Sequence, residues 1–436
     1  MTEPNLTRAR LIPVTGIGST FEAEQRATSA FLAVLSIVRE LSTDLLAPLG
    51  ASGALKAKVD TFTEVRLPRT KFRPDGLIRV EYGASSWSVL VEVKTGVNNL
   101  TAEQINAYWD LARKHHINHV LTISNEIAPK DGVHPTDGLR VLAKSHVQVY
   151  HLSWTAIASA ALRIKRHRGV SDPEQAYLLE ELIRYLEHPS SGALDFSDMG
   201  QHWVGVRDGA REGTLSKKTV GVEDVVARWD QLLRFAALKL SAEIGEDVGP
   251  VFPHDQTDVN QRTSAMIESL TETGALSGGL HIPHTAGDLR VEADVRARRL
   301  MASMNVRAPL DKGAKGRVSW LVNQLKDAPG DVVIESFAKN ARTGIVATLG
   351  KTRDDRQTLL DDARTKPHRF KVLMRSEMRP GRKARGRSLG FIGSVLRLIN
   401  GFYGDVVQAI TPWQQPTPKL ESAAVVEQSD DSPERY

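Results

Sequence analysis

Two carboxylates and an amine are predicted to meet at one end of a β-hairpin. Asp75 follows Pro74 at the start of one apolar run, and Glu92 and Lys94 close the next run. Both runs alternate apolar and polar residues, which is typical of β-strands. Turn residues 83–85 separate the runs, so pairing as a hairpin returns Asp75 to a position beside Glu92 and Lys94. The sequence therefore predicts a small site with two acids and one amine.

Such a trio suits the hydrolysis of phosphodiester bonds. Carboxylate oxygens are hard ligands for Mg²⁺, which keeps several waters and takes further ligands from phosphate oxygens. The metal lowers the pKa of a bound water and offsets the charge that develops on the phosphate. Asp75 and Glu92 are the expected ligands of Mg²⁺, or of Mn²⁺ in its place. Lys94 is expected to orient or deprotonate the attacking water, or to stabilise the transition state by its charge.

Three short motifs follow one another around this predicted site. They are Pro74-Asp75 at a strand start, Glu92-Val93-Lys94 at a strand end, and Gln104-x-x-x-Tyr108 on the next helix. The first two resemble the PD and ExK elements of the PD-(D/E)xK nuclease superfamily, which has the restriction-endonuclease-like fold. The third resembles the extra helical motif of the variant found in helicase-associated nucleases. Each motif alone is weak, but together they fall on the expected elements over roughly residues 21–168.

Gln104 and Tyr108 each allow two interpretations. Thr101 is a plausible N-cap for a helix over residues 101–116, so Gln104 either completes a capping box or reaches into the site, and it can do both. Tyr108 lies one turn further along the same face, either as a site contact or as a core residue.

The first helix, predicted over residues 21–46, offers another acid. Ser19 is its expected N-cap, with Glu22 at the third helical position. Glu24 lies in line with the apolar stripe and faces inward. In the superfamily that the motifs resemble, this helix often supplies an acid to the site, which makes Glu24 the candidate. The alternative is that Glu24 is only a first-turn acid favoured by the helix dipole.

The remaining patterns complete an α/β unit over residues 1–169. Further strands are predicted at 59–67, 119–124 and 147–152, and a closing helix at 153–167. The order αβββαβ, with an additional βα, suits the restriction-endonuclease-like fold. Three histidines, His115, His116 and His119, are given structural roles, because neighbouring histidines on a helix point to different faces.

The rest of the chain is predicted as a helical region and a C-terminal α+β module. Residues 170–249 contain amphipathic helices at 176–186 and 222–244. Residues 250–412 are expected to form strands near 289–305 and 332–340, a helix at 316–325 and a final helix at 389–410. The last residues, 413–436, are polar and are expected to be disordered.

A basic segment, residues 364–387, carries ten Lys or Arg against one acid. Such a run is either a solvated hairpin or a contact to nucleic acid, whose affinity then falls steeply with salt. The residues expected to contact nucleic acid are Arg382, Lys383, Arg385 and Arg387.

Composition narrows the function classes. The absence of cysteine excludes disulfides, thiolate zinc sites and a cysteine nucleophile. With neither a secretory signal nor a long apolar stretch, a cytoplasmic protein without membrane contact is expected. The net charge of +5 is compatible with nucleic acid as a partner.

Together these observations predict a Mg²⁺-dependent nuclease. DNA is the expected substrate, because most of the superfamily that the motifs resemble cuts DNA, and a homodimer is compatible with the sequence. One alternative, which the intact Asp75, Glu92 and Lys94 set disfavours, is a nucleic-acid-binding protein that keeps the fold without the chemistry. A further alternative is a scaffold for protein partners.

Overall fold

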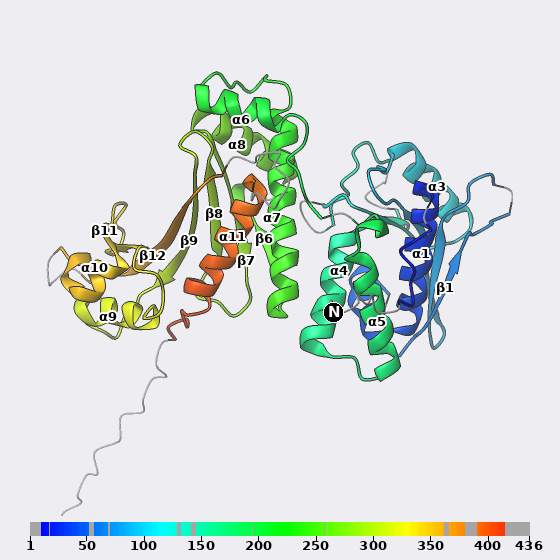
Figure 1. The fold of residues 1–436 in the computed structure, drawn as a ribbon, viewed down its shortest axis with the longest axis horizontal. Helices are drawn as coiled ribbons and strands as arrows, with labels where there is room; N and C mark the ends of the chain where they lie inside the picture. The colour runs from blue at the N-terminus through cyan, green and yellow to red at the C-terminus, as the bar shows by residue number, and fades with distance from the viewer. Residues whose placement is uncertain are drawn as a thin grey trace, which may run out of the picture.

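The protein has a mixed α/β fold built on two β-sheets, each covered by its own helices (Figure 1). The structure is a computed structural model, and this coarse fold class agrees with the one predicted. It describes residues 10–16, 18–51, 56–68, 70–128, 132–140, 145–193, 195–256, 258–361, 366–379 and 390–414. Within these ranges, no helix combines the length and the apolar character needed to cross a membrane.

The first sheet has five strands in the order β1-β2-β3-β4-β5. They are β1 (Lys58–Thr63), β2 (Gly76–Tyr82), β3 (Ser85–Val93), β4 (His119–Ser124) and β5 (Gln148–Ser153). The first three pair antiparallel, whereas β3, β4 and β5 run parallel. The predicted hairpin of β2 and β3 is present, and its register sets Gly76 opposite Val91.

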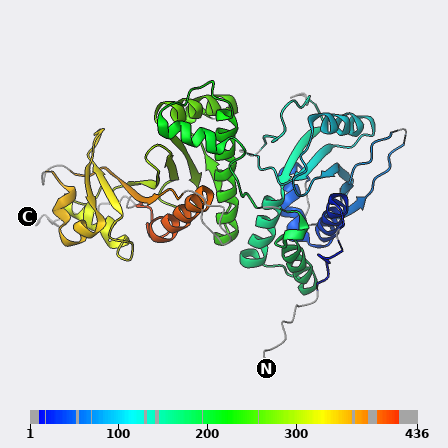
Figure 2. The same ribbon diagram turned by 45° about the horizontal axis from the view of Figure 1, so that its top comes forward.

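Helices cover both faces of this sheet. One face packs on α1 (Thr20–Ile37), α2 (Arg39–Leu46), α4 (Trp154–Arg163) and α5 (Pro173–Leu186), and the other on α3 (Ala102–Lys114). In Figure 2, α3 and α1 are seen on opposite sides of the first sheet. The central strand β3 is thus buried on both sides, with Val89 and Val91 toward α1 and Leu90 toward α3. This burial gives the polar end of β3 a fixed position.

Two predicted elements of this unit differ from the structure. The helix expected over residues 21–46 is two helices, because Val38 adopts an extended backbone (φ −83°, ψ 100°) between α1 and α2. Its side chain stays buried, so the apolar periodicity continues across the break. The strand expected over 59–67 ends at Thr63, where Glu64 takes a left-handed backbone (φ 53°).

The last helix of the first unit also differs from its prediction. Residues 153–167 form α4 followed by a π-helical turn, Ile164–Arg168. In the middle of the chain come α6 (Trp203–Glu212), which was not predicted, and the long α7 (Val222–Ile244). One side of α7 contacts α4, and the other contacts the second sheet (Figure 1).

The second sheet has seven antiparallel strands in the order β11-β10-β12-β9-β8-β7-β6. They are β6 (Gly249–Val251), β7 (Ala275–His281), β8 (Leu289–Asp294), β9 (Arg299–Arg307), β10 (Val333–Phe337), β11 (Ile345–Thr348) and β12 (Arg369–Glu377). Its helices are α8 (Val259–Glu272), α9 (Ala314–Gln324), α10 (Leu349–Asp354) and α11 (Phe391–Phe402).

Several details of this module were not predicted. The single strand expected near 289–305 is the hairpin of β8 and β9, which turns where Arg298 takes a left-handed backbone (φ 56°). The final helix, expected over 389–410, is α11 followed by a π-helical turn, Tyr403–Val407. The predicted tail lies outside the described residues from 415 onward.

Candidate active site

The six predicted site residues converge at the carboxyl end of β3. Asp75 comes directly before β2, and its Oδ2 accepts a hydrogen bond of 2.8 Å from the Val93 backbone N–H. That bond fixes the Asp75 carboxylate at the end of β3, where Glu92 and Lys94 point to the same side of the strand. Glu24 reaches the site from α1, and Gln104 and Tyr108 reach it from α3.

Glu92 is the buried centre of this cluster, with 2 % of its surface exposed. Its Oε1 accepts hydrogen bonds from Lys94 Nζ (2.8 Å) and Gln104 Nε2. Its Oε2 is buried and has no hydrogen-bond partner. Burial, together with repulsion from Asp75, raises the pKa of Glu92 to about 7.

Asp75 shares the same environment. Burial raises its pKa, against the opposing effects of the Val93 N–H and the charge of Lys94. Two acids with raised pKa values in one site are the arrangement expected where a metal ion would supply the missing positive charge.

Lys94 lies between two acids and carries a positive charge. Its Nζ is 2.8 Å from Glu92 Oε1 and 3.7 Å from Glu24 Oε2. Burial alone would lower the pKa of Lys94, but the neighbouring carboxylates raise it overall. In this arrangement the Lys94 ammonium keeps its proton.

Glu24 faces inward, and a residue not predicted from the sequence holds it there. The amide of Asn98 donates to Glu24 Oε1 at 2.6 Å, and the Thr95 N–H approaches the same oxygen at 3.4 Å. Glu22 instead accepts from the Gly18 N–H while Ser19 caps the helix, as expected for a capping residue. The only advance signal for Asn98 was its place shortly after the end of β3.

The two interpretations of Gln104 are resolved by its contacts. Thr101 Oγ1 accepts from the Gln104 backbone N–H at 3.3 Å, so the cap is formed. The Gln104 side chain does not turn back toward Thr101 but donates to Glu92. It therefore helps to cap the helix through its backbone and positions a site carboxylate through its side chain.

Tyr108 contributes both to the core and to the site. Its ring packs in the small core under α3, and its hydroxyl donates to the Arg73 carbonyl at 3.3 Å. Burial and the nearby Glu92 raise the pKa of Tyr108, so the phenol keeps its proton. It can donate a hydrogen bond but cannot accept a proton.

The loop after β3 is fixed by long-range contacts that the sequence did not reveal. Trp154 Nε1 donates to the Lys94 carbonyl at 2.9 Å, and Asn125 Nδ2 donates to the carbonyls of Gly96 (2.9 Å) and Gly192 (2.8 Å). A Cβ on Gly192 would come within 2.8 Å of Thr95. This close packing holds the Lys94 backbone in place.

The carboxylates at the carboxyl end of β3 are ligands of the type that a divalent metal ion takes. Asp75 and the unpartnered Glu92 Oε2 offer two hard oxygen ligands, the number that Mg²⁺ commonly takes from a protein before water and phosphate complete its shell. Among the described residues, no group of three or more His, Asp or Glu side chains is arranged to bind a metal. His119 instead packs its ring against Trp87 and Tyr150, which is a structural role.

The predicted nucleic-acid contacts Arg382, Lys383, Arg385 and Arg387 lie outside the described residues. The part of the basic segment that the structure describes is not a solvated hairpin. It includes β12, an interior strand paired with β9 and β10, whose Phe370 and Val372 are buried.

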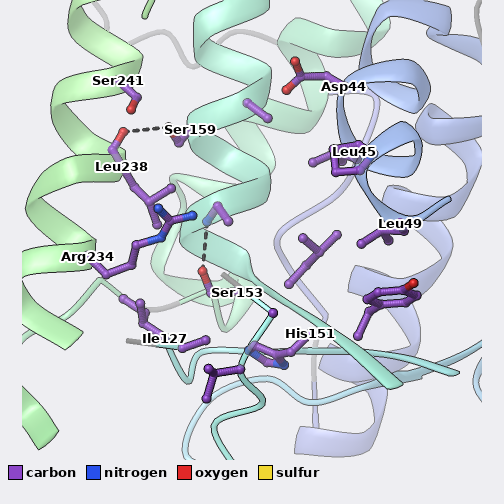
Figure 3. Close-up of a pocket in the computed structure, with 18 of the residues that line it drawn as sticks. Asp44, Leu45, Leu49, Ile127, His151, Ser153, Ser159, Arg234, Leu238 and Ser241 are labelled. Carbon is purple, nitrogen blue, oxygen red and sulfur yellow. Dashed lines mark hydrogen bonds between the residues drawn. The ribbon is translucent and has the colours of Figure 1, made fainter. Parts of the chain in front are cut away.

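A separate cavity of about 330 Å³ lies between α2, α4, β5 and α7 (Figure 3). None of the six site residues lines it. Ser159 Oγ donates to the Leu238 carbonyl at 2.6 Å, and Arg163 pairs with Asp44 (2.7 Å) and Asp247 (3.2 Å). These polar groups are therefore bonded within the protein.

Comparisons of the chain with models of known families, with curated proteins and with solved structures find no significant match. Functional inference therefore depends on the site itself.

Magnesium should stabilise the folded protein more at about pH 8 than at about pH 5.5. The raised pKa values of Asp75 and Glu92 mean that, between about pH 4.5 and pH 7, the metal-free folded state binds more protons than the unfolded state. The site's contribution to stability therefore falls as the pH rises through that window, and a bound cation offsets the loss. Thermal unfolding with and without Mg²⁺ at both pH values measures this effect, and an equal shift at both would contradict it.

Proposed function

We propose that this protein is a metal-dependent nuclease that hydrolyses phosphodiester bonds, with DNA as the substrate. The observation that carries the proposal is the buried Glu92, which has an unpartnered oxygen beside Asp75 and a charged Lys94 at its other oxygen. Outside a catalytic or ligand-binding site, a buried carboxylate with a free oxygen beside a second acid only costs stability.

Each residue has a distinct role in this proposal. Asp75 and Glu92 hold Mg²⁺, which when bound lowers the pKa of a water and neutralises phosphate charge. Lys94 contributes a second positive charge toward the phosphoryl oxygens in the transition state. Glu24 holds the Lys94 ammonium from its other side.

Two residues on α3 complete the site. The Gln104 amide keeps Glu92 in the orientation that leaves Oε2 free. The Tyr108 hydroxyl keeps its proton and donates it in a hydrogen bond to the Arg73 carbonyl, which fixes the ring beside Glu92 and Asp75. Both are therefore positioning residues in this account.

The fold around the site supports assignment to the PD-(D/E)xK superfamily. The first unit follows the order αβββαβ, with the first helix broken in two, and adds a further strand and helix. The PD motif precedes β2, the ExK motif ends β3, and the Gln-x-x-x-Tyr motif lies on α3. We infer a restriction-endonuclease-like core on this basis.

The proposal is tested by incubating the purified full-length protein with supercoiled plasmid and with labelled oligonucleotides. Cleavage in Mg²⁺ or Mn²⁺ that stops on addition of chelator is the expected result. Binding to DNA without cleavage, unchanged by chelator, would contradict the proposal and favour a binding protein on the same fold.

One face of the second sheet supports the alternative function, a nucleic-acid-binding protein that does not cut. Residues Arg307, Arg369, Lys371 and Arg375 lie on the face of β9 and β12 opposite the buried Phe370 and Val372. Arg369 stacks over the Phe337 ring, with its guanidinium carbon 3.6 Å from the ring centre. Two acids lie on the same face: Glu335, which pairs in register with Lys371, and Glu377, two residues after Arg375 on β12. The net positive charge matches a phosphate backbone.

Replacing both Arg307 and Arg375 with Gln is expected to weaken nucleic-acid binding and to reduce its salt dependence. Each lost phosphate contact should lower the slope of log affinity against log salt by about one. Fluorescence anisotropy at several salt concentrations measures the slope. Lys114→Gln, at the exposed end of α3, is the matched control, and an unchanged slope in the double variant would contradict this interface.

A further inference from the structure

Exposed aromatic side chains lie beside the candidate site. Phe21, in the first turn of α1, is 63 % exposed, and Phe72, just before the PD motif, is 49 % exposed. The Phe72 ring packs edge-on against Tyr108, with ring centres 6.1 Å apart and an interplanar angle of 80°. Single exposed aromatic residues are common on protein surfaces, but these two lie beside the candidate active site.

Phe21 lines a groove that leads to Asp75. The groove has a volume of about 270 Å³, and its lining also includes Arg66 and Arg73. It thus runs between the start of α1 and the segment that follows β1, with Asp75 forming part of its wall. A substrate that lies in it is next to Asp75, one of the residues of the proposed nuclease site.

Cations accompany the aromatic rings along the same segment. Arg66, Lys71 and Arg73 are all exposed. The acid beside them in the groove, apart from Asp75, is Glu64, which accepts a hydrogen bond from Gln25 Nε2 at 3.3 Å. The segment therefore offers positive charge and aromatic surface together.

We propose that this groove binds an unpaired nucleic-acid strand. Arg66 and Arg73 contact phosphates on either side of the bond to be cut, and Phe21 stacks on a base inside the groove. Phe72, which is exposed beside Arg73 but does not line the groove, stacks on a neighbouring base of the same strand. The inference rests on the proposed nuclease function and specifies its substrate as a single-stranded or frayed segment.

The combination of rings and cations favours an unpaired strand over a duplex. In a duplex, the base faces are stacked on one another and unavailable to a protein ring, whereas a single strand exposes them. Binding sites for single strands combine a positively charged groove with aromatic stacking surfaces. Because Tyr108 already supports the Phe72 ring, little side-chain freedom remains to be lost on binding.

The test is metal-free binding, measured by fluorescence anisotropy in chelator. The probes are a labelled single-stranded DNA, the RNA of the same sequence and the matched blunt DNA duplex. The full-length protein is expected to bind the single strands at least about tenfold more tightly than the duplex, and the comparison of DNA with RNA identifies the natural strand. A duplex bound as tightly as the single strand would overturn the inference.

Variants assign the effect to the groove. Phe72→Leu should weaken single-strand binding by about tenfold, the scale of losing one stacked base, with little change for the duplex. Arg73→Gln should weaken it and lower its salt dependence. Tyr82→Leu, an exposed aromatic at the far end of β2, is the control. Wild-type affinity in both Phe72→Leu and Arg73→Gln would overturn the inference.

The failure of the proposed function is distinguishable from the failure of this inference. Strand binding that depends on Phe72, without any cleavage in Mg²⁺, would exclude the nuclease and leave the groove assignment standing. Metal-dependent cleavage of duplex and single strands at equal rates, unaffected by Phe72→Leu, would support the nuclease and exclude the groove as a binding site for single strands.

Discussion

Glu92→Gln is expected to abolish metal-dependent cleavage while making the metal-free protein more stable. Glutamine keeps the size of the side chain and can still accept from Lys94 and Gln104, but it removes a charged metal ligand. Loss of one charge-stabilising group at a reacting phosphate should lower the rate by on the order of 10³-fold. The rate is measured in a single-turnover cleavage assay with Mg²⁺.

The expected gain in stability of Glu92→Gln distinguishes a functional site from a structural ion pair, because removing one partner of a structural ion pair would lower the stability. Glu92 is buried beside Asp75 with one oxygen unpartnered, so a neutral side chain should gain about 1 kcal/mol at about pH 8. Thermal and urea unfolding without metal measure this gain. Glu81→Gln, an exposed acid on β2, is the control. A Glu92→Gln protein that unfolds more easily and cuts normally would contradict the site.

Arg262→Met is expected to destabilise the C-terminal half strongly. Arg262 and Asp230 join α8 to α7 inside the second core, where their side chains are only 4 % and 8 % exposed. Two hydrogen bonds link them, from Nε to Oδ2 (3.2 Å) and from one terminal nitrogen to Oδ1 (2.9 Å). Removing the arginine leaves a buried carboxylate without a cation, at a cost of about 3–5 kcal/mol.

Urea unfolding at neutral pH measures the cost of Arg262→Met. The control is Arg299→Met, because Arg299 pairs with Asp294 at 3.7 Å on the surface and is 64 % exposed. A surface pair of this kind should contribute less than about 1 kcal/mol. Similar losses in the two variants would mean that the Asp230 carboxylate finds another partner or water. Burial raises the pKa of Asp230, against the effect of Arg262, so the loss should be smaller in acid.

The site was predictable because its main residues are local in sequence and alternate with apolar neighbours. A period of two places Glu92 and Lys94 on one face of a strand, and the hairpin brings Asp75 to them without any long-range assumption. Glu24 was predictable only by a choice between two acids of the first helix, Glu22 and Glu24. For Gln104 the sequence left two interpretations open, because the third position of the helix suits both a capping residue and a residue that reaches into the site.

Other features depend on contacts between distant residues. Asn98, in the loop after β3, donates to Glu24 on α1, and Trp154, at the start of α4, donates to the Lys94 carbonyl. In the second sheet, β12 inserts between β9 and β10, so its basic residues belong to an interior strand, which local charge did not indicate. The break at Val38 was hidden because its buried side chain preserves the helical periodicity.

The assignment of Asp75 to a nuclease site is tested by cleavage assays run side by side on wild type, Asp75→Asn and the exposed-acid control Asp110→Asn. Each protein is incubated with Mg²⁺ and with labelled single-stranded and duplex DNA, and folding is checked by circular dichroism. Wild type and Asp110→Asn are expected to cut at similar rates, whereas Asp75→Asn is expected not to cut. Equal cleavage by Asp75→Asn, or none by folded wild type with Mg²⁺ or Mn²⁺, would contradict this assignment.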